Sequence, residues 1–154
     1  MLTLVTPTLK DLWFRQELMA DEDTMSYNAK WGGTISFPKE KWESWYDSWI
    51  RNSENKRFYR YLMNSDNIYV GEIAYYYDRQ RDIYICDVIV LAKYRNHGYG
   101  TEGIRQLCIA AKKNGIFVLH DDIAADNPSY NLFLKNGFEI EYKNNDVVMV
   151  KRNL

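Results

Sequence analysis

One segment in the middle of the chain carries the residue types of an anion-binding turn. An apolar, strand-like run ends at Leu91, and the next residues include the basic side chains of Lys93, Arg95 and His97. Gly98-Tyr99-Gly100 follows and leads into a helical pattern. Loop amides and the free N–H groups of such a helix start point at one spot, where the helix dipole adds about half a positive charge. The pattern predicts a phosphate-binding turn; the alternative is a strand-to-helix turn in which the glycines serve only the backbone.

The two commonest phosphate-binding motifs are absent. The sequence contains no G-x-x-x-x-G-K-[ST], which argues against a P-loop kinase or triphosphatase. A dinucleotide-binding G-x-G-x-x-G turn follows the first strand of its fold, whereas Gly98-Tyr99-Gly100 comes after about four predicted strands and has no third glycine in register. The spacing therefore argues against a Rossmann oxidoreductase as well.

Carboxylates interrupt the predicted strands around this segment. Asp87 lies in an apolar run and shares its alternation with Ile89, so its carboxylate needs a partner or a use. Glu72 lies in the preceding strand. Asp121 and Asp122 end a later strand, where alternation sends the two side chains to opposite faces and at most one of them into a common cleft. For each acid, the alternative to a role in a functional site is solvent exposure or a surface ion pair.

An α+β arrangement must position these residues. Runs rich in β-branched and aromatic residues alternate with helical periodicity, most clearly where Trp42, Trp45 and Trp49 form one face. We interpret this face as core packing; the alternative is that its edge shapes a hydrophobic or cation-binding substrate pocket. Residues 27–37 have no period and are predicted as a loop. The predicted strands are 2–6, 57–63, 68–77, 83–91, 117–123, 138–142 and 147–150, and the predicted helices are 7–19, 38–52, 101–113 and 127–134.

Composition limits the class of protein. The chain of 154 residues, 46% of them hydrophobic, suits one compact domain, 1–154. Its net charge of −1 gives no reason to expect nucleic acid or a membrane as a partner. The sequence has no signal-peptide pattern, so we expect a cytoplasmic protein. Cys86 and Cys108 are expected to be buried thiols, and His97 and His120 lie too far apart, without a third ligand, to predict a metal site.

Two blocks of sequence resemble the GNAT superfamily of N-acetyltransferases. Arg95-Asn96-His97-Gly98-Tyr99-Gly100 resembles the R/Q-x-x-G-x-G/A acetyl-CoA signature of that superfamily. Asn127-Pro128-Ser129 through Gly137-Phe138 is similar to its N-P-x-A/S … L-Y-E-K-x-G-F segment, and the order of predicted elements matches over essentially the whole chain. The resemblance implies an α+β (mixed α/β) fold of the GNAT acyl-CoA N-acyltransferase type. Its central, mostly antiparallel sheet is splayed between the fourth and fifth strands and flanked by helices.

The resemblance implies an acetyltransferase activity. Acetyl would pass from acetyl-CoA, as cosubstrate and without a metal, directly to a primary amine of a small molecule or peptide. One alternative is a protein of the same fold that binds or senses CoA with little or no turnover, and another is an α/β module in which the glycine segment is only a turn. The resemblance places acceptor specificity in residues 27–37 and leaves both a monomer and a homodimer open.

The resemblance also assigns residues to acetyl-CoA. Its pyrophosphate would lie on the amides of 96–101 beside Arg95, and unpaired backbone groups of 88–90 would hold the pantetheine arm, with one N–H polarising the thioester carbonyl. Asn127 would contact the arm from the other side, although counting back from Gly137 places Asp126 there. The implied cofactor-binding residues are Val88, Ile89, Val90, Arg95, Asn96, His97, Gly98, Tyr99, Gly100, Thr101, Asn127 and Phe133.

The predicted catalytic residues depart from the family pattern. Phe133 stands where family members often carry a tyrosine that protonates the leaving thiolate, and phenylalanine has no proton to donate. Tyr130, one helical turn earlier, is either a replacement donor or a packing residue. An acceptor ammonium must lose a proton before it attacks the thioester, so a carboxylate is wanted as general base. The candidate bases are Asp87, Glu72 and either Asp121 or Asp122.

Overall fold

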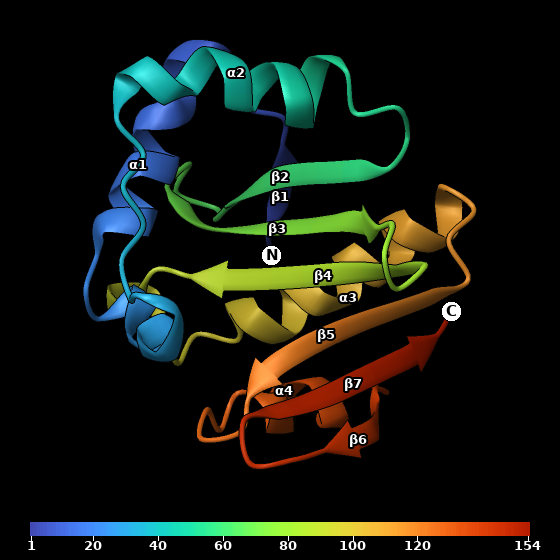
Figure 1. Ribbon diagram of the computed structural model, residues 1–154. Coiled ribbons are helices and arrows are strands. Elements are labelled where there is room, and N and C mark those ends of the chain that lie inside the picture. The colour runs from blue at the N-terminus through green and yellow to red at the C-terminus, as the bar shows by residue number, and fades with distance from the viewer.

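A seven-stranded sheet runs through the molecule, seen here in a computed structural model that describes all 154 residues (Figure 1). The strand order is β1-β2-β3-β4-β5-β7-β6, and all neighbouring pairs are antiparallel except β4 with β5. This mixed α/β architecture with an antiparallel β2-β3-β4 meander confirms the predicted fold class. The strands are β1 (Thr3–Val5), β2 (Arg57–Met63), β3 (Tyr69–Asp78), β4 (Ile83–Val90), β5 (Val118–Ala124), β6 (Glu139–Lys143) and β7 (Val147–Asn153).

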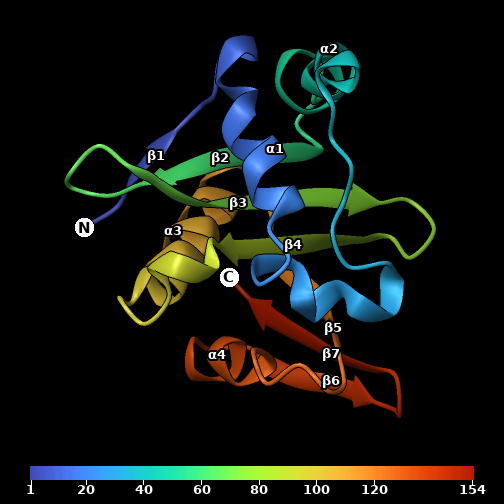
Figure 2. The same cartoon turned by 90° about the vertical axis from the view of Figure 1, so that its left-hand side faces the viewer.

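Helices cover both faces of the sheet. Figure 2 shows α3 and α4 on one face, and α1, α2 and the segment between them on the other. The α-helices are α1 (Trp13–Ala20), α2 (Trp42–Tyr46), α3 (Tyr99–Lys113) and α4 (Tyr130–Lys135). The 3-10 helices are η1 (Leu9–Leu12), η2 (Thr24–Trp31), η3 (Lys39–Lys41) and η5 (Ala92–Tyr94), and η4 (Asp47–Arg51) is a short π-helix.

Each helical layer buries a hydrophobic core against the sheet. On one face, α3 contributes Ile104 and Leu107, which repeat at helical spacing and are almost completely buried. On the other face, α1 packs Phe14 and Leu18 against the ring of Tyr61. Burying one such side chain contributes about 1.5–3 kcal/mol relative to leaving it in water. Both faces of the sheet are therefore held firmly, and the site has a rigid frame.

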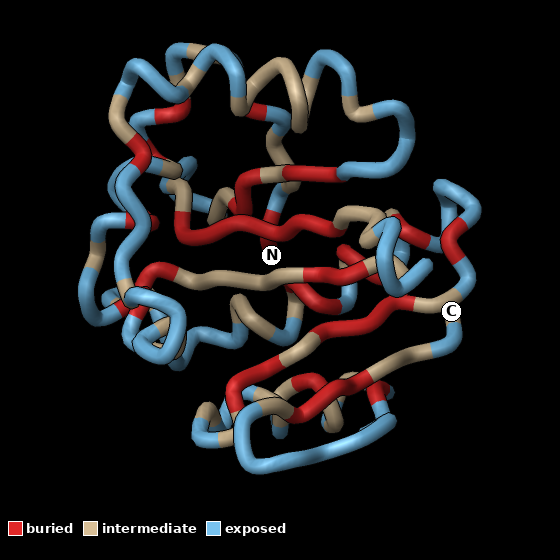
Figure 3. The backbone as a smooth tube through the Cα atoms, in the orientation of Figure 1, coloured by how far each residue is buried: buried red, intermediate tan, exposed pale blue.

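The strands β4 and β5 pair at one end only. Their parallel register includes Tyr84 opposite Leu119 and Ile85 opposite His120, and beyond these residues the two strands diverge (Figure 1). Residues 87–90 are half-buried although β4 is a central strand, and Figure 3 shows this stretch between buried parts of β3 and β5. The predicted splay between the fourth and fifth strands is confirmed, and it opens a slot in the middle of the sheet.

Two segments differ from the predicted elements. The prediction of a loop over 27–37 is wrong in its first part, because Thr24–Trp31 forms the 3-10 helix η2. A 3-10 helix repeats every three residues, so it leaves no 3.6-residue period in the sequence. The carboxylate of Asp21 caps this helix by accepting the backbone N–H of its first residue. The predicted helix over 38–52 is helical but changes type along its length, from 3-10 through α to π.

Candidate active site

The slot between β4 and β5 opens into a cavity of about 840 Å³. Four segments line it: η2, the diverging half of β4, the turn that leads into α3, and the end of β5 with the turn that leads into α4. The cavity therefore connects the predicted anion-binding turn to carboxylates of both diverging strands. It is the place in the fold where the residues singled out from the sequence come together.

The turn into α3 has the geometry of an anion-binding site. Gly98 has a φ of +79°, the left-handed conformation that favours glycine, and Asn96 adopts a similar φ of +66°. The first N–H groups of α3, including those of Gly100 and Thr101, have no acceptor within the helix. These amides and the dipole of a 15-residue helix favour a phosphate at this end of the cavity.

Arg95 and Thr24 attach this turn to η2. The Arg95 guanidinium donates from Nη2 to the carbonyl oxygen of Thr24 at 3.1 Å. The backbone N–H of Ala92 donates to Thr24 Oγ1 at 2.8 Å. A guanidinium has five N–H donors, so Arg95, which lines the cavity, keeps others for a bound anion. One wall of the cavity is thus joined directly to its anion-binding end.

His97 lies beside the turn and does not line the cavity. Its Nδ1 is 2.8 Å from the carbonyl oxygen of Arg95 and 3.1 Å from that of Tyr94, so this nitrogen carries the proton and donates it. The imidazole stacks on Tyr99, with ring centroids 5.6 Å apart. In this arrangement His97 supports the backbone of the turn, and the structure does not bring it to the predicted cofactor site.

Gly100 allows α3 and α4 to approach closely. A Cβ atom at this position would lie 2.8 Å from Cδ2 of Leu132 in α4, closer than carbon atoms pack. Leu132 also lines the cavity, next to the turn. The second glycine of the Gly98-Tyr99-Gly100 motif therefore has a packing role.

The edge of β4 that faces the slot has unpaired backbone groups. The N–H of Leu91 donates to the carbonyl oxygen of Val70, on the β3 side, at 2.8 Å. Backbone direction alternates along a strand, so the N–H and C=O groups of Val88 and Val90 point away from β3, toward the slot. β5 has already diverged at this level. An extended ligand chain can pair with this edge as an added strand.

Three aspartates meet at the closed end of the slot. Asp87 on β4 and Asp121 and Asp122 on β5 follow the last β4–β5 pair, and all three line the cavity. Asp122 accepts a hydrogen bond from Arg81 at 3.1 Å. The prediction that at most one of Asp121 and Asp122 faces the cleft is wrong, because the divergence of β4 opens the edge of β5 to the cavity from both faces.

Burial and mutual repulsion disfavour the charged forms of these acids. Burial raises the pKa of Asp87 to about 7, and the carboxylates of Glu72 and Asp122 contribute to this shift. The pKa of Asp121 is raised well above its ordinary value by burial and by Asp87 and Asp122. The pKa of the Tyr27 phenol, on η2, is raised by burial and by Asp87. Asp87 thus titrates near neutral pH, which suits a proton acceptor.

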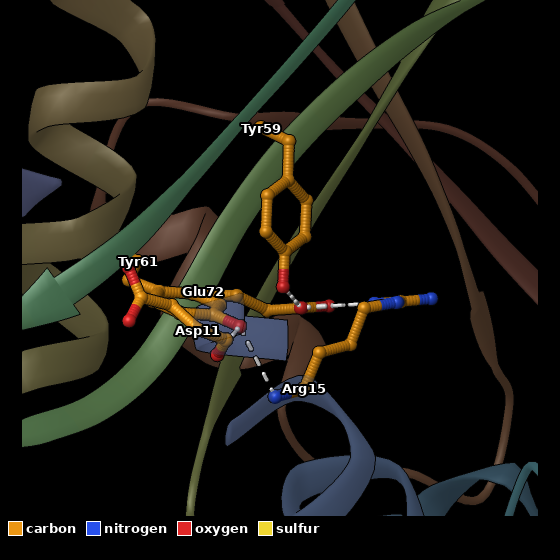
Figure 4. Close-up of polar contacts among 5 residues, drawn as sticks. All are labelled: Asp11, Arg15, Tyr59, Tyr61 and Glu72. Carbon is orange, nitrogen blue, oxygen red and sulfur yellow. Dashed lines mark hydrogen bonds and ion pairs between the residues drawn. The ribbon is translucent and has the colours of Figure 1, made fainter. Parts of the chain in front are cut away.

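Glu72 lies on the same face of the sheet as Asp87 but is fully paired. Nη1 of Arg15 donates to its two carboxylate oxygens at 3.0 and 3.2 Å, and the Tyr59 hydroxyl donates to Oε2 (Figure 4). Aromatic rings surround the guanidinium, with centroids 4.6 Å away for Trp45 and 5.1 Å for Phe37. Burial disfavours the charge of Arg15, yet Glu72 and Tyr59 raise the pKa of Arg15 overall. The structure places the predicted base Glu72 in a buried ion pair outside the cavity lining.

The aromatic residues of α4 have different surroundings. Phe133 is buried, packs edge-on against Phe138 with centroids 5.1 Å apart, and lines the cavity. Tyr130 is half-buried, and Lys143 Nζ lies 5.5 Å from the centroid of its ring. Tyr130 is not part of the cavity lining, so the structure does not bring this predicted replacement donor to the site. Asn127, just before α4, does line the cavity, and its Oδ1 accepts the backbone N–H of Ser129 at 3.0 Å.

Most residues predicted from the sequence meet at the cavity. Those that line it are Asp87, Val88, Ile89, Val90, Arg95, Asn96, Gly98, Tyr99, Gly100, Thr101, Asp122, Asn127 and Phe133. Glu72, His97 and Tyr130 do not. Sequence reasoning missed Thr24, for which the spacing Asp21-x-x-Thr24 of a capped helix start was a usable signal. No pattern in the sequence indicated that Tyr27 faces the aspartates.

Comparisons with known proteins identify the family. A model of the family described as "Acetyltransferase (GNAT) family" matches residues 13–138, which is most of the chain. The chain belongs to the GNAT acetyltransferase family. No curated protein sequence matches this GNAT protein. No helix in it is long and apolar enough to cross a membrane, and no group of three or more His, Cys, Asp or Glu side chains is placed to hold a metal ion.

Solved structures share the fold of this GNAT protein. A spermidine N-acetyltransferase from Vibrio cholerae in complex with CoA and spermine has a TM-score of 0.80 at 18% identity, covering 99% of this chain and 95% of that one. PaiA N-acetyltransferase from Thermoplasma acidophilum in complex with coenzyme A has a TM-score of 0.72 at 15% identity, covering 100% and 99%. An acetyltransferase of the GNAT family from Bacillus anthracis has a TM-score of 0.71 at 20% identity, covering 99% and 94%. At these identities the likeness establishes the fold.

Proposed function

We propose that this GNAT protein transfers the acetyl group of acetyl-CoA directly to a primary amine. The observation that carries the proposal is the continuity of one cavity, which joins the turn into α3, the unpaired edge of β4 and the carboxyl of Asp87. An anion-binding turn suits phosphates, an unpaired strand edge suits an extended amide-containing arm, and a carboxyl near neutrality suits deprotonation of an amine. Acetyl-CoA, when bound, supplies the activated acetyl group.

The chain offers a binding group for each part of acetyl-CoA. The amides of 98–101 and the free donors of Arg95 would hold the pyrophosphate. The backbone of Val88 and Val90 would pair with the pantetheine arm, and one N–H of this edge would polarise the thioester carbonyl. Because the carbonyl would be bound by a backbone group, this role needs no particular side chain.

Asp87 is the proposed general base. It lines the cavity near the closed end of the slot and has a pKa of about 7, so a large fraction is available as carboxylate at neutral pH. Glu72, by comparison, already accepts hydrogen bonds from Arg15 and Tyr59. Taking a proton at Glu72 would require breaking that pair, so Asp87 is the better acceptor.

A cationic amine without an adjacent carboxylate is the proposed acceptor class. The carboxyl groups of Asp87 and Asp122 line the cavity on one face of the sheet, where the acceptor would bind, and Arg81 beside them is already paired with Asp78 and Asp122. Such a site attracts ammonium groups and repels carboxylates. The similar Vibrio cholerae enzyme is a spermidine N-acetyltransferase solved with spermine, which supports testing small cationic amines first.

A thiol-release assay with acetyl-CoA tests the proposal. The panel should pair each cationic amine with a carboxylated counterpart, for example cadaverine with lysine. We expect release with the cationic member and little release with the other. CoA binding without thiol release for any amine would instead support a CoA-binding or sensing protein. Phe133 favours this alternative, because it stands where a tyrosine often serves as the proton donor.

Two variants test the anion-binding turn. Arg95→Ala removes a cation, and Gly98→Asp adds a negative charge and a side chain at a φ of +79°. We expect each to weaken CoA binding by about tenfold or more, or about 1.4 kcal/mol, measured by calorimetry. Arg105→Ala is the matched control, because Arg105 lies on the exposed side of α3 and pairs with Glu102. Unchanged CoA affinity in both turn variants would show that this turn is not the phosphate site.

A further inference from the structure

Asp121 is a buried carboxyl whose only hydrogen-bond partner is the backbone N–H of Asp122. The residue is 8% exposed, and no side chain hydrogen-bonds to it or pairs with its charge. The exposure that remains is toward the cavity, which it lines. A buried carboxylate with no cation nearby is unfavourable, so the protonated form predominates. The chain therefore keeps a carboxylic acid, rather than a carboxylate, beside the proposed acetyl-CoA site.

The groups around Asp121 are acidic or apolar. Asp87 on β4 and Asp122 on β5 are near enough that both oppose its ionisation. The titratable and neighbouring side chains from the surrounding elements are Cys86 and Asp87 on β4, Asp122 on β5, Tyr27 on η2 and Val150 opposite on β7. None of them is basic. Together with burial, this raises the pKa of Asp121 well above its ordinary value.

Asp121 and Asp87 approach the slot from opposite faces of the sheet. Along β5, Asp121 alternates in phase with Leu119 and Ile123, which belong to the core that includes Phe133 of α4. Along β4, Asp87 is in phase with Ile89, which packs against the core on the α1 side. A group bound in the slot would thus have Asp87 on one side and Asp121 on the other, with Phe133 on the side of Asp121.

We propose that Asp121 is the general acid that protonates the sulfur of CoA, the task left open by Phe133. This inference rests on the proposed acetyl transfer. The amine nitrogen bonds to the thioester carbonyl carbon, the C–S bond breaks with its electron pair on sulfur, and the carboxyl proton of Asp121 passes to that sulfur. The proton lost by nitrogen goes to Asp87. Proton exchange through solvent then restores Asp87 as carboxylate and Asp121 as acid.

Tyr27 is the competing proton donor. Its phenol also reaches the cavity, but it extends from η2, on the same side of the sheet as Asp87. A base and an acid on opposite sides of the thioester can act on nitrogen and sulfur at once, whereas two groups on one side compete for the same position. The geometry therefore favours Asp121, and Tyr27→Phe becomes one arm of the test.

The test compares Asp121→Asn, Asp121→Glu and Tyr27→Phe with the wild type. Asparagine keeps the shape of the side chain but has no acidic proton, so we expect kcat with acetyl-CoA to fall by about 10²-fold, while affinity for CoA measured by calorimetry is unchanged. In the wild type, kcat should decrease at high pH as Asp121 ionises. This alkaline limb should be absent in Asp121→Asn and present in Asp121→Glu. Glu141→Gln, on β6 and outside the cavity lining, is the matched control.

A measurement on the wild-type protein checks the protonation state directly. With aspartate labelled by ¹³C at the side-chain carboxyl, the resonance missing in Asp121→Asn should report a neutral carboxyl at pH 7. An ionised carboxyl at that pH, full activity of Asp121→Asn, or loss of the alkaline limb in Tyr27→Phe would each overturn the role of Asp121. A wild type that releases no thiol with any amine would instead overturn the proposed function itself.

Discussion

Two buried carboxyls of the same sheet, Glu72 on β3 and Asp121 on β5, have opposite surroundings. Both are almost inaccessible to solvent, at 3% and 8% exposure. Glu72 accepts hydrogen bonds from Arg15 and Tyr59, whereas Asp121 lies near the acid Asp87 and pairs with no cation. One acid is neutralised by a neighbouring charge and belongs to the frame; the other is neutralised by its own proton and lies at the cavity. Partners, rather than residue type or burial, separate the structural acid Glu72 from the proposed proton donor Asp121.

The largest effect is expected when the paired carboxyl loses its partner. Arg15→Met keeps an apolar chain among the aromatic rings but leaves Glu72 charged and uncompensated. We expect the free energy of unfolding to fall by about 3–5 kcal/mol at pH 7, measured by urea denaturation. The double variant Arg15→Met with Glu72→Gln should recover most of the loss, because no buried charge then remains. A loss of less than about 1 kcal/mol in Arg15→Met would mean that Glu72 does not depend on Arg15 for its stability as a buried charge.

The next effect concerns the unpaired carboxyl on β4. Asp87→Asn removes the proposed base, and we expect kcat/KM to decrease by about 10²-fold. A base acts when deprotonated and the pKa of Asp87 is about 7, so wild-type kcat/KM should rise with pH through about 7. The rise should disappear in Asp87→Asn. A variant that keeps both its rate and its acidic limb would place the base elsewhere.

The smallest effect concerns stability at the unpaired carboxyl on β5. The raised pKa of Asp121 means that its native-state contribution is fully present below the unfolded pKa of about 3.9 and is lost as pH rises toward the raised value. Over that window the loss is about 1.4 kcal/mol per pH unit. Between pH 4 and pH 5 the wild type should therefore lose about 1.4 kcal/mol that Asp121→Asn does not lose, and the melting temperature of the variant should improve relative to the wild type over that interval. A difference that does not change with pH would mean that Asp121 is not buried as an acid.

Features formed by residues that are adjacent in the chain were predictable from the sequence. The turn with Arg95, Gly98 and Gly100 is a local arrangement, because its amides are positioned by adjacent residues and by the start of α3. The amphipathic pattern of α3 and the alternation of β4 likewise depend on neighbours in the chain. The splay of the sheet was expected from the family resemblance, and the two short β4–β5 pairs confirm it.

Features that depend on distant contacts were not predictable in this way. Glu72 looks like a free acid in the sequence, and its partner Arg15 belongs to a helix far away along the chain. Alternation correctly places Asp121 and Asp122 on opposite faces, but only the divergence of β4 brings both to one cavity. The position of Tyr27 depends on a 3-10 helix, which has no 3.6-residue periodicity to detect.

The close approach of α3 and α4 at Gly100 also determines how far apart the two halves of the sheet lie. Only two residue pairs connect β4 to β5, while α3 packs on β3 and β4 and α4 packs on β6 and β7. The contact of Gly100 with Leu132 joins these two helices across the slot. Because Gly100 has no side chain, the two helices can meet here, and the width of the slot is set by helix packing rather than by the strands that line it.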